Sequence, residues 1–501
     1  MELTNLQPRL YQEQIFSTAT QKNVLAILPT GLGKTAIALM LAIHRLKQFP
    51  ESRIIFSAPT KPLCDQHLHT FQHHLPELKE SEFALVTGLV KPSEREELYK
   101  KRFIFATPQT LANDLISGKL KLDDISLLVI DEAHRAVGDY DYVFLAKHYA
   151  EKARHQRILA LTASPGTSKA EIKQICTNLF IEEVEVRDET SEDVAEYVQE
   201  KEVKRIMIEL PEEIKEVKQM LERSLKSRLH ILKENKVLQS EDIDKVRKRQ
   251  LLMMQGSFVR QAKGNWFHMK NISTIAAAIK VMHCLELLQT QGIQPLRVFL
   301  DSLKIQALKV KAAQSLMEDT DFREAMKRIY EMESKGIEHP KFAKLVELIR
   351  GYTAPNKRII IFTQYRNTAD KIVEHLSNIP GIKPVKFIGQ KSGMSQKEQL
   401  QTINDFKAGV YNTLVATCIA EEGLHVENAD LGIFFEPVPS TLRSIQREGR
   451  IGRTHIGTVF VLITQDTIDE KYYWVSFHKR NKMKKALEDI KKEGVTWQTK
   501  L

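Results

Sequence analysis

Residues 28–35 read LPTGLGKT and combine two glycines, a lysine and a threonine between an apolar run and a helix-forming segment. In that context backbone N–H groups and a helix N-terminus converge on phosphate oxygens. Lys34 is suited to neutralise the β and γ phosphates, and the Thr35 hydroxyl to bind magnesium. The strict pattern GxxxxGKT is missed at its first position, where Leu28 stands. We expect a nucleotide site made by Leu28, Pro29, Thr30, Gly31, Leu32, Gly33, Lys34 and Thr35.

A second motif, LLVIDEAH, places two carboxylates at the end of an apolar run, Asp131 and Glu132. A carboxylate at a strand end beside a P-loop holds magnesium through water, and a second one orients or deprotonates the attacking water. We therefore expect Asp131 to share the metal with Thr35, and Glu132 to activate water for ATP hydrolysis.

The motif IQREGRIGR follows later and supplies Gln446, Arg447, Arg450 and Arg453. Phosphoryl transfer is accelerated by an arginine that reaches the developing charge, by about 10³ to 10⁵ in well-studied enzymes. No second P-loop accompanies this motif. The pattern predicts one ATP site in a cleft between two domains, with Gln446, Arg450 and Arg453 as catalytic residues.

The elements that must position these groups alternate between strand-like and helix-like segments. Apolar runs such as RIIFSAP, SLLVID and RILALTAS alternate with helical stretches up to residue 179, and the same rhythm returns after residue 340. Continuous apolar strands in this alternation predict an α/β fold with two doubly wound parallel sheets. Between residues 201 and 340 strand signals vanish and apolar residues recur at helical spacing. We expect domains at residues 1–198 and 341–501, and an all-helical insertion at residues 199–340.

Length and composition agree with a large enzyme. The chain has 501 residues, 42% of them hydrophobic, and Lys plus Arg (74) less Asp plus Glu (64) gives +10. These values exclude a small binding module or a disordered protein, and the charge favours a polyanionic partner over a membrane. Cys64, Cys176, Cys284 and Cys418 stand too far apart for a CxxC metal site. With no signal segment recognised, we expect a soluble cytoplasmic protein, nucleoid-associated in a prokaryote.

The ordered motifs GLGKT, APTKPL, TPQTL, DEAH, TAS, VATCIAEEGL and QREGRIGR resemble those of the superfamily 2 DEAH-box helicases. Such proteins have two RecA-like domains. The EEGL variant, FFEPVPS and the helical insertion resemble the helicase half of archaeal Hef and its FANCM-type relatives, which act on forked and branched DNA. Dicer and the RIG-I-like duplex-RNA translocases have a similar layout, so a duplex-RNA translocase or RNA helicase is the alternative. A non-hydrolysing scaffold is disfavoured by the intact Lys34, Asp131, Glu132 and Arg450.

The resemblance implies further roles. Gln12 would read the adenine edge, Arg9 would stack on it, and Gly423 would approach the nucleotide. His425 stands where family members usually carry an aspartate near the ribose, which weakens the expectation of strict ATP preference. Thr162 and Ser164 would couple hydrolysis to strand movement. Hydroxyl and backbone donors would hold the tracked strand through phosphates, which carry little sequence information. These contacts are Thr60, Lys61, Thr87, Gly88 and Thr107 in the first domain, and Gln364 and Thr417 in the second.

Residues 245–285 contain no acidic residue, while lysines and arginines accumulate. Such a stretch suits phosphate neutralisation along a duplex. The insertion resembles the thumb-like domain of Hef-type proteins, so we expect Arg247, Lys248 and Arg249 to contact branched DNA. Trp266 and Phe267 are expected in the core. No nuclease motif follows residue 463; cleavage is not expected, and a nuclease or clamp partner could act in trans.

Four histidines near Cys64, namely His67, His69, His73 and His74, invite a metal-site interpretation. They fall on one expected helix, and one helix cannot easily surround an ion. We therefore expect Mg²⁺ bound with ATP as the metal cofactor, and no separate site at these histidines.

Overall fold

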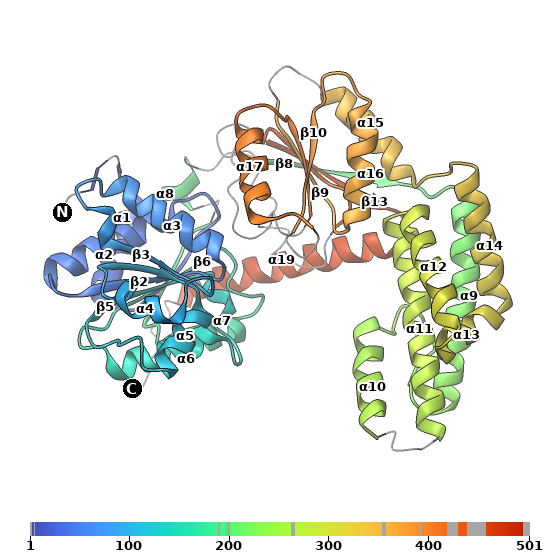
Figure 1. Ribbon diagram of the computed structural model, residues 1–501, viewed down its shortest axis with the longest axis horizontal. Coiled ribbons are helices and arrows are strands. Elements are labelled where there is room, and N and C mark those ends of the chain that lie inside the picture. The colour runs from blue at the N-terminus through green and yellow to red at the C-terminus, as the bar shows by residue number, and fades with distance from the viewer. Residues whose placement is uncertain are drawn as a thin grey trace.

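The computed structural model describes residues 3–4, 6–188, 191–195, 197, 201–261, 266–352, 357–389, 393–417, 429–437 and 457–493. Two parallel sheets with helices on both faces form two α/β domains, and a helical insertion projects beside the second (Figure 1). The predicted fold class is confirmed. Gln446, Arg447, Arg450, Arg453, Gly423 and His425 lie outside the described residues.

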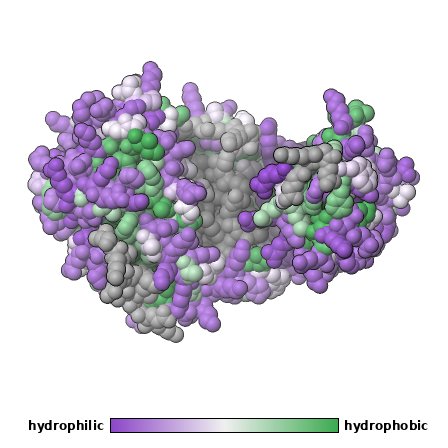
Figure 2. All heavy atoms as spheres, turned by 90° about the horizontal axis from the view of Figure 1, so that it is seen from below, coloured by the Kyte–Doolittle hydropathy of each residue, from purple (hydrophilic) through white to green (hydrophobic). Residues whose placement is uncertain are grey.

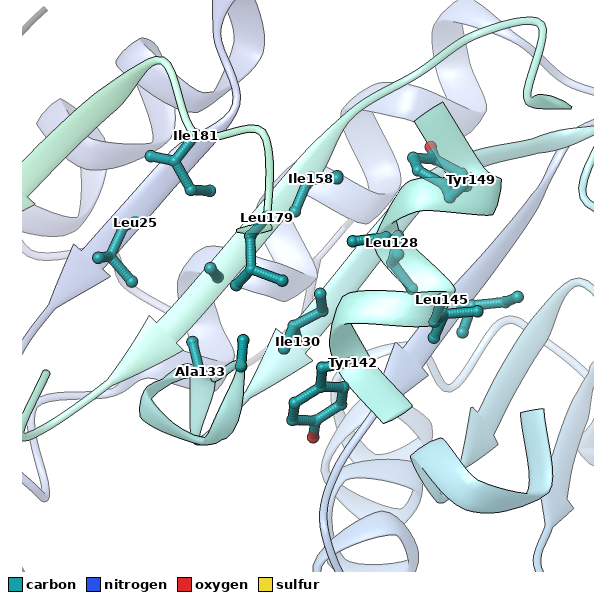
Figure 3. Close-up of a cluster of buried hydrophobic side chains, with 14 of the residues drawn as sticks. Leu25, Leu128, Ile130, Ala133, Tyr142, Leu145, Tyr149, Ile158, Leu179 and Ile181 are labelled. Atoms are coloured by element: carbon teal, nitrogen blue, oxygen red, sulfur yellow. The ribbon is translucent and has the colours of Figure 1, made fainter. Parts of the chain in front are cut away.

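The first sheet has the strand order β3-β4-β2-β5-β6-β1-β7, and every pair is parallel. Successive residues of a strand point to opposite faces, so Leu128 and Ile130 join one core while Leu127 and Val129 join the other. Figure 3 shows part of the first core, where Tyr142 and Tyr149 lie over β5. The strands are β1 (Val24–Ile27), β2 (Arg53–Ser57), β3 (Phe83–Val86), β4 (Phe103–Ala106), β5 (Ile125–Asp131), β6 (Ile158–Thr162) and β7 (Glu183–Val186).

The helices of the first domain cover both faces of this sheet. Two of them begin at functional motifs, because α2 starts at Lys34 and α3 at Lys61. The set is α1 (Leu10–Gln21), α2 (Lys34–Gln48), α3 (Lys61–His74), α4 (Pro92–Leu98), α5 (Pro108–Ile116), α6 (Asp141–Lys152), α7 (Lys169–Asn178) and α8 (Glu192–Ala195), with short 3₁₀ turns at Glu80–Glu82 and Ala133–Arg135.

The second sheet has the order β10-β11-β9-β12-β13-β8 and is also parallel throughout. Its edge strand β8 (Lys201–Ile208) pairs with β13 along all eight residues. The sequence analysis expected no strand between residues 201 and 340, so it was wrong here. The other elements are α15 (Pro340–Tyr352), β9 (Ile359–Phe362), α16 (Arg366–Ser377), β10 (Pro384–Phe387), α17 (Gln396–Lys407), β11 (Thr413–Ala416), β12 (Leu431–Phe434) and β13 (Gly457–Thr464).

The insertion is a helical bundle with its own apolar core. Ile214, Val217, Leu221, Leu225 and Leu229 recur at helical spacing, and all are buried in that core. The central helix α11 is long and apolar enough to cross a membrane by length and composition alone, but half of its most apolar stretch is buried in the bundle. The helices are α9 (Glu212–Glu234), α10 (Lys248–Gln261), α11 (Trp266–Thr290), α12 (Ile293–Ala307), α13 (Lys311–Glu318) and α14 (Thr320–Ser334).

The last described helix, α19 (Ile468–Glu493), links the two domains (Figure 1, red). It leaves the second sheet after β13, and Met483, Leu487 and Ile490 pack into the core of the first domain. Asp489 adds an ion pair to Lys169 of α7, with Nζ and Oδ2 3.7 Å apart. The two α/β domains are therefore joined by a packed helix.

A buried polar joint fastens the insertion to the second domain. Within the second domain, Lys341 of α15 pairs with Asp469 of α19, and both side chains are 0% exposed. Gln289 of α11 accepts a hydrogen bond from the backbone N of Ile468 at 2.9 Å. Because buried charges and amides are stable only when paired, the ion pair holds α15 against α19, and the Gln289 contact attaches the insertion to α19.

Candidate nucleotide site and nucleic-acid interface

The nucleotide motifs meet at the carboxyl edge of the first sheet. The P-loop follows β1, Thr162 ends β6 and Asp131 ends β5, and these three strands are neighbours in the order β5-β6-β1. Ligands of open α/β sheets bind at this edge. The fold thus brings together motifs that lie far apart in the sequence.

The P-loop needs glycine at Gly33, the residue before α2. Its backbone is left-handed, with φ +69°, and a Cβ there would lie 2.4 Å from Nε2 of Gln12. That amide nitrogen donates to the carbonyl of Leu32 at 3.1 Å, and the Tyr11 hydroxyl donates to the same oxygen at 2.9 Å. Two side chains of the first helix α1 therefore hold the phosphate loop through the carbonyl of Leu32.

Gln12 and Arg9 are engaged within the protein. Oε1 of Gln12 accepts from the backbone N of Arg9 at 3.0 Å, and Gln12 is buried. The guanidinium carbon of Arg9 lies 4.3 Å from the ring centroid of Tyr197. Their expected roles at adenine stay predictions, and the structure shows that both residues also stabilise the loop region.

Lys34 and Thr35 begin α2, and the positive charge of Lys34 acts on the carboxylate of Asp131. Nζ of Lys34 donates to the carbonyl oxygens of Leu28 and Pro29 at 3.1 and 3.3 Å. Burial acts to raise the pKa of Asp131, but its contact with His67 and the charge of Lys34 lower it by more. Asp131 is therefore held ionised, as a metal-binding carboxylate must be.

Glu132 occupies a strained position immediately after β5. Its φ is +51°, in the left-handed region that few non-glycine residues adopt. Non-glycine residues with this backbone conformation are concentrated at functional sites. Its Oε2 lies 3.2 Å from Nδ1 of His134, and that same nitrogen lies 3.2 Å from the Thr162 hydroxyl. The Thr162 hydroxyl also accepts from the backbone N of Ser164. The proposed base and the proposed coupling residues are thus joined through His134, which the sequence analysis did not single out.

The expected strand contacts of the first domain occupy the other half of the same edge. Thr60 and Lys61 follow β2, Thr87 and Gly88 follow β3, and Thr107 follows β4, in the order β3-β4-β2. Thr60 and Thr107 precede α3 and α5 as N-cap residues, and Gly88 is exposed. Nucleotide and strand candidates therefore divide one edge between them, with β5 in the middle.

In the second domain the two expected contacts follow neighbouring strands. Gln364 comes after β9 and Thr417 after β11. The buried Glu436 accepts from the Thr363 hydroxyl at 3.1 Å and from the backbone N of Gln364. The fold brings Gln364 and Thr417 to the same carboxyl edge, and their roles stay predictions.

The basic segment of the insertion differs from expectation in two ways. Arg247 and Arg249 are exposed, but Lys248 is bound to Glu286, with Nζ and Oε2 3.0 Å apart. Burial acts to raise the pKa of Glu286, yet His283 and Lys248 hold it at about 2. The expectation that Trp266 and Phe267 are core residues is wrong, because they are 72% and 42% exposed. They lie where α11 begins, at the far end of the bundle.

The histidines of α3 form no cluster. His69 is exposed beside Asp65, and His73 and His74 contact each other by their ring edges. Within the described ranges, no group of three histidine, cysteine or carboxylate residues is placed to hold a metal. His67 alone faces the P-loop.

Three families match successive parts of the chain. The DEAD/DEAH box helicase family matches residues 9–172, and the helicase conserved C-terminal domain matches residues 340–455. The family described as "Putative ATP-dependent RNA helicase, helical bundle" matches residues 213–336. Together with the paired parallel sheets, these matches define a superfamily 2 helicase.

Comparison with individual proteins indicates the family to which the chain belongs within this superfamily. A Methanocaldococcus jannaschii protein named "Putative ATP-dependent RNA helicase" is 39% identical over 97% of this chain. An ATP-dependent DNA helicase of Schizosaccharomyces pombe is 32% identical over 93% of it. The chain spans 61% and 58% of those two proteins. The crystal structure of the Pyrococcus furiosus Hef helicase domain is 40% identical, with a TM-score of 0.72 over 94% of this chain and 98% of that one. The chain belongs to the Hef-type family of ATP-dependent helicases.

Proposed function

We propose that this chain is an ATP-driven DNA translocase that remodels forks and four-way junctions in DNA repair or in the restart of stalled forks. The Schizosaccharomyces pombe relative is named as a DNA helicase, and the Pyrococcus furiosus domain is that of Hef. The proposal that the substrate is branched rests on one observation, the exposed surface formed by α10 and the start of α11.

ATP hydrolysis is assigned to the carboxyl edge of the first sheet. The Thr35 hydroxyl and the Asp131 carboxylate are hard oxygen donors on adjacent segments, so they fit Mg²⁺. Bound there with ATP, Mg²⁺ would neutralise phosphate charge. Lys34 would hold the β and γ phosphates, and Glu132 would orient the attacking water.

The basic side of the surface is built for phosphates. Arg247, Arg249, Arg260 and Lys270 are exposed, and none of them has an ion pair in the part of the chain that the structure describes. No acidic residue lies between residues 245 and 285 to oppose an approaching backbone. Each phosphate contact releases counterions, so binding here depends steeply on salt.

The same surface exposes apolar side chains. On α10, Leu252 and Val259 are 50% and 57% exposed and lie two turns apart on one helix face, and Met253 beside them is 67% exposed. On α11, Trp266 and Met269 are 72% and 54% exposed, and Nζ of Lys270 lies 5.3 Å from the Trp266 ring centroid. In Figure 2, apolar side chains reach the surface beside hydrophilic ones on the insertion. Rings and cations together suit unpaired bases, which a fork exposes where its strands separate.

The position of this surface fits a second contact with the substrate. The motor edges hold one strand, whereas α10 and α11 project away from the second domain (Figure 1). The hydrogen bond from the backbone N of Ile468 to the Gln289 side chain, 2.9 Å long, fastens the insertion to that domain. Movement of the second domain during ATP turnover would therefore carry the surface with it.

A duplex-RNA translocase is the second candidate. Both the helical-bundle family and the Methanocaldococcus jannaschii relative carry RNA helicase in their names. Phosphate contacts alone do not separate the two polymers. To decide between DNA and RNA, binding therefore has to be measured on both polymers.

A salt series tests the proposal. Fork, single-stranded DNA and duplex RNA of equal length are bound to the wild-type chain and to the variant Arg247→Ala/Arg249→Ala. Two lost contacts should lower the salt slope on forks by about 1.8, since each contributes about 0.9. Binding of single-stranded DNA should keep its slope. Arg223→Ala is the control, because Arg223 lies on α9 of the same insertion and pairs with Asp321 at 2.8 Å.

Three outcomes oppose the proposal. Equal losses on fork and single-stranded DNA, or no loss on forks, would mean that the basic surface does not hold a second arm. Tighter binding to duplex RNA than to forks, with the slope change appearing on RNA, would favour the RNA translocase.

A further inference from the structure

His67 lies between two side chains of the nucleotide site that come from different segments. Its Nδ1 is 3.2 Å from the Thr35 hydroxyl, and its Nε2 is 3.0 Å from Oδ2 of Asp131. The residue is 5% exposed and comes from α3. One imidazole thus connects the P-loop to the end of β5.

The hydrogen-bonding capacity of the three side chains determines which atom donates in each contact. An ionised carboxylate only accepts, so in the neutral imidazole the single ring proton sits on Nε2 and is donated to Asp131. Nδ1 then accepts the proton of the Thr35 hydroxyl. In this tautomer the hydroxyl hydrogen is directed to His67, which leaves the lone pairs of that oxygen available to a cation. The same contact fixes one carboxylate oxygen of Asp131.

Packing holds the ring in this orientation. The ring centroid of His67 lies 4.2 Å from that of Phe56, with the planes tilted by 31°. Phe56 is 1% exposed within β2, and Cys64, one turn earlier on α3, is fully buried. The Tyr142 hydroxyl donates to the backbone carbonyl of Asp131 at 2.8 Å and fixes that residue from the other side.

We propose that His67 is a positioning residue, which aligns the Thr35 hydroxyl and the Asp131 carboxylate to receive the divalent cation that accompanies ATP. Outer residues of this kind orient ligands, and their loss typically costs about 10- to 100-fold in metal affinity. The inference rests on the use of ATP and not on the nucleic acid proposed above. A negative result in the fork-binding experiment would therefore not contradict this inference.

Mn²⁺ binding tests the proposal without requiring turnover. The probe is Mn²⁺, followed by electron paramagnetic resonance, on the full chain saturated with a non-hydrolysable ATP analogue. His67→Phe keeps a ring against Phe56 and removes both hydrogen bonds. We expect its Kd for Mn²⁺ to rise by about 10- to 100-fold. Affinity for a fluorescent ATP analogue in EDTA should stay within twofold of wild type, because Lys34 and the loop backbone are unchanged.

Two further variants complete the test. His69→Phe, on the exposed side of the same helix, should leave the Kd for Mn²⁺ unchanged. His67→Gln restores a donor near the position of Nε2 and should recover part of the lost affinity. An unchanged Kd in a folded His67→Phe protein would overturn the proposal. Equal losses of Mn²⁺ and metal-free nucleotide binding would show a structural role only. If His67→Phe does not fold, the Kd for Mn²⁺ and the metal-free nucleotide affinity of His67→Gln test the proposal in its place.

Discussion

Replacing Lys341 with methionine should loosen the packing of α15 against α19 in the second domain, beside the contact that α19 makes with the insertion. Both members of the Lys341–Asp469 pair are 0% exposed, and Asp469 also accepts from N and Oγ1 of Thr464 at 3.2 and 2.9 Å. Removing the lysine alone leaves a buried carboxylate without its cation, which typically costs about 3–5 kcal/mol. Replacing Asp469 with leucine as well removes the uncompensated charge, so the double variant should regain most of that loss.

Native-state hydrogen exchange measures this change locally, which suits a chain of several domains. Amides of α15 and β13 should exchange roughly 10²- to 10⁴-fold faster in Lys341→Met, at about 1.4 kcal/mol per tenfold change. Lys344→Met is the matched control on α15, because its pair with Glu347 is solvent-accessible and should be worth less than about 1 kcal/mol. Exchange in Lys341→Met within threefold of wild type would refute the reasoning, since the pair would then contribute little to the packing of α15 against α19.

Three other changes have expected outcomes. Glu132→Gln should reduce nucleic-acid-stimulated ATP hydrolysis to below about a tenth while nucleotide binding persists, and faster turnover would exclude Glu132 as the base. Burial and the charge of Lys341 lower the pKa of His339 to about 3, so its stabilisation is complete above the unfolded pKa near 6.5 and is lost as pH falls toward 3. The urea midpoint should therefore drop across that window, and less so in His339→Gln; identical pH profiles would contradict this. Trp266→Ala should weaken binding to forks with unpaired bases at the branch by about 1–3 kcal/mol and spare linear duplex, whereas equal losses on both would argue against stacking.

Most of the two sheets could be predicted from the sequence because their strands are buried on both faces. Runs such as LLVI in β5 and IIIF in β9 are continuous and apolar, as parallel strands covered by helices must be. β8 escaped prediction because KEVKRIMI mixes four charged residues with four apolar ones and so lacks the continuous apolar run of the inner strands; it lies at a sheet edge, where Val203 and Met207 stay 43% and 44% exposed. Its pairing with β13 joins residues more than two hundred positions apart, which no local pattern reveals.

The candidate site was predictable in composition but not in all its contacts. Helical spacing could place Cys64, His67, Leu68 and Phe71 on one buried face of α3. That this face meets the P-loop follows from the strand order β2-β5-β6-β1, which the sequence does not contain. The exposure of Trp266 escaped prediction for a similar reason, because large aromatic residues are usually buried and only the bundle shows that this end of α11 has no covering element in the described chain.

ATP-driven movement of a DNA four-way junction tests the central proposal most directly. With the wild-type chain, ATP and Mg²⁺, labelled junctions should resolve into their two product duplexes, and single-turnover rates should exceed those on an RNA duplex of equal length. Glu132→Gln should bind the junction without resolving it. Resolution by the wild type without ATP, or ATP-dependent activity confined to RNA, would contradict the account.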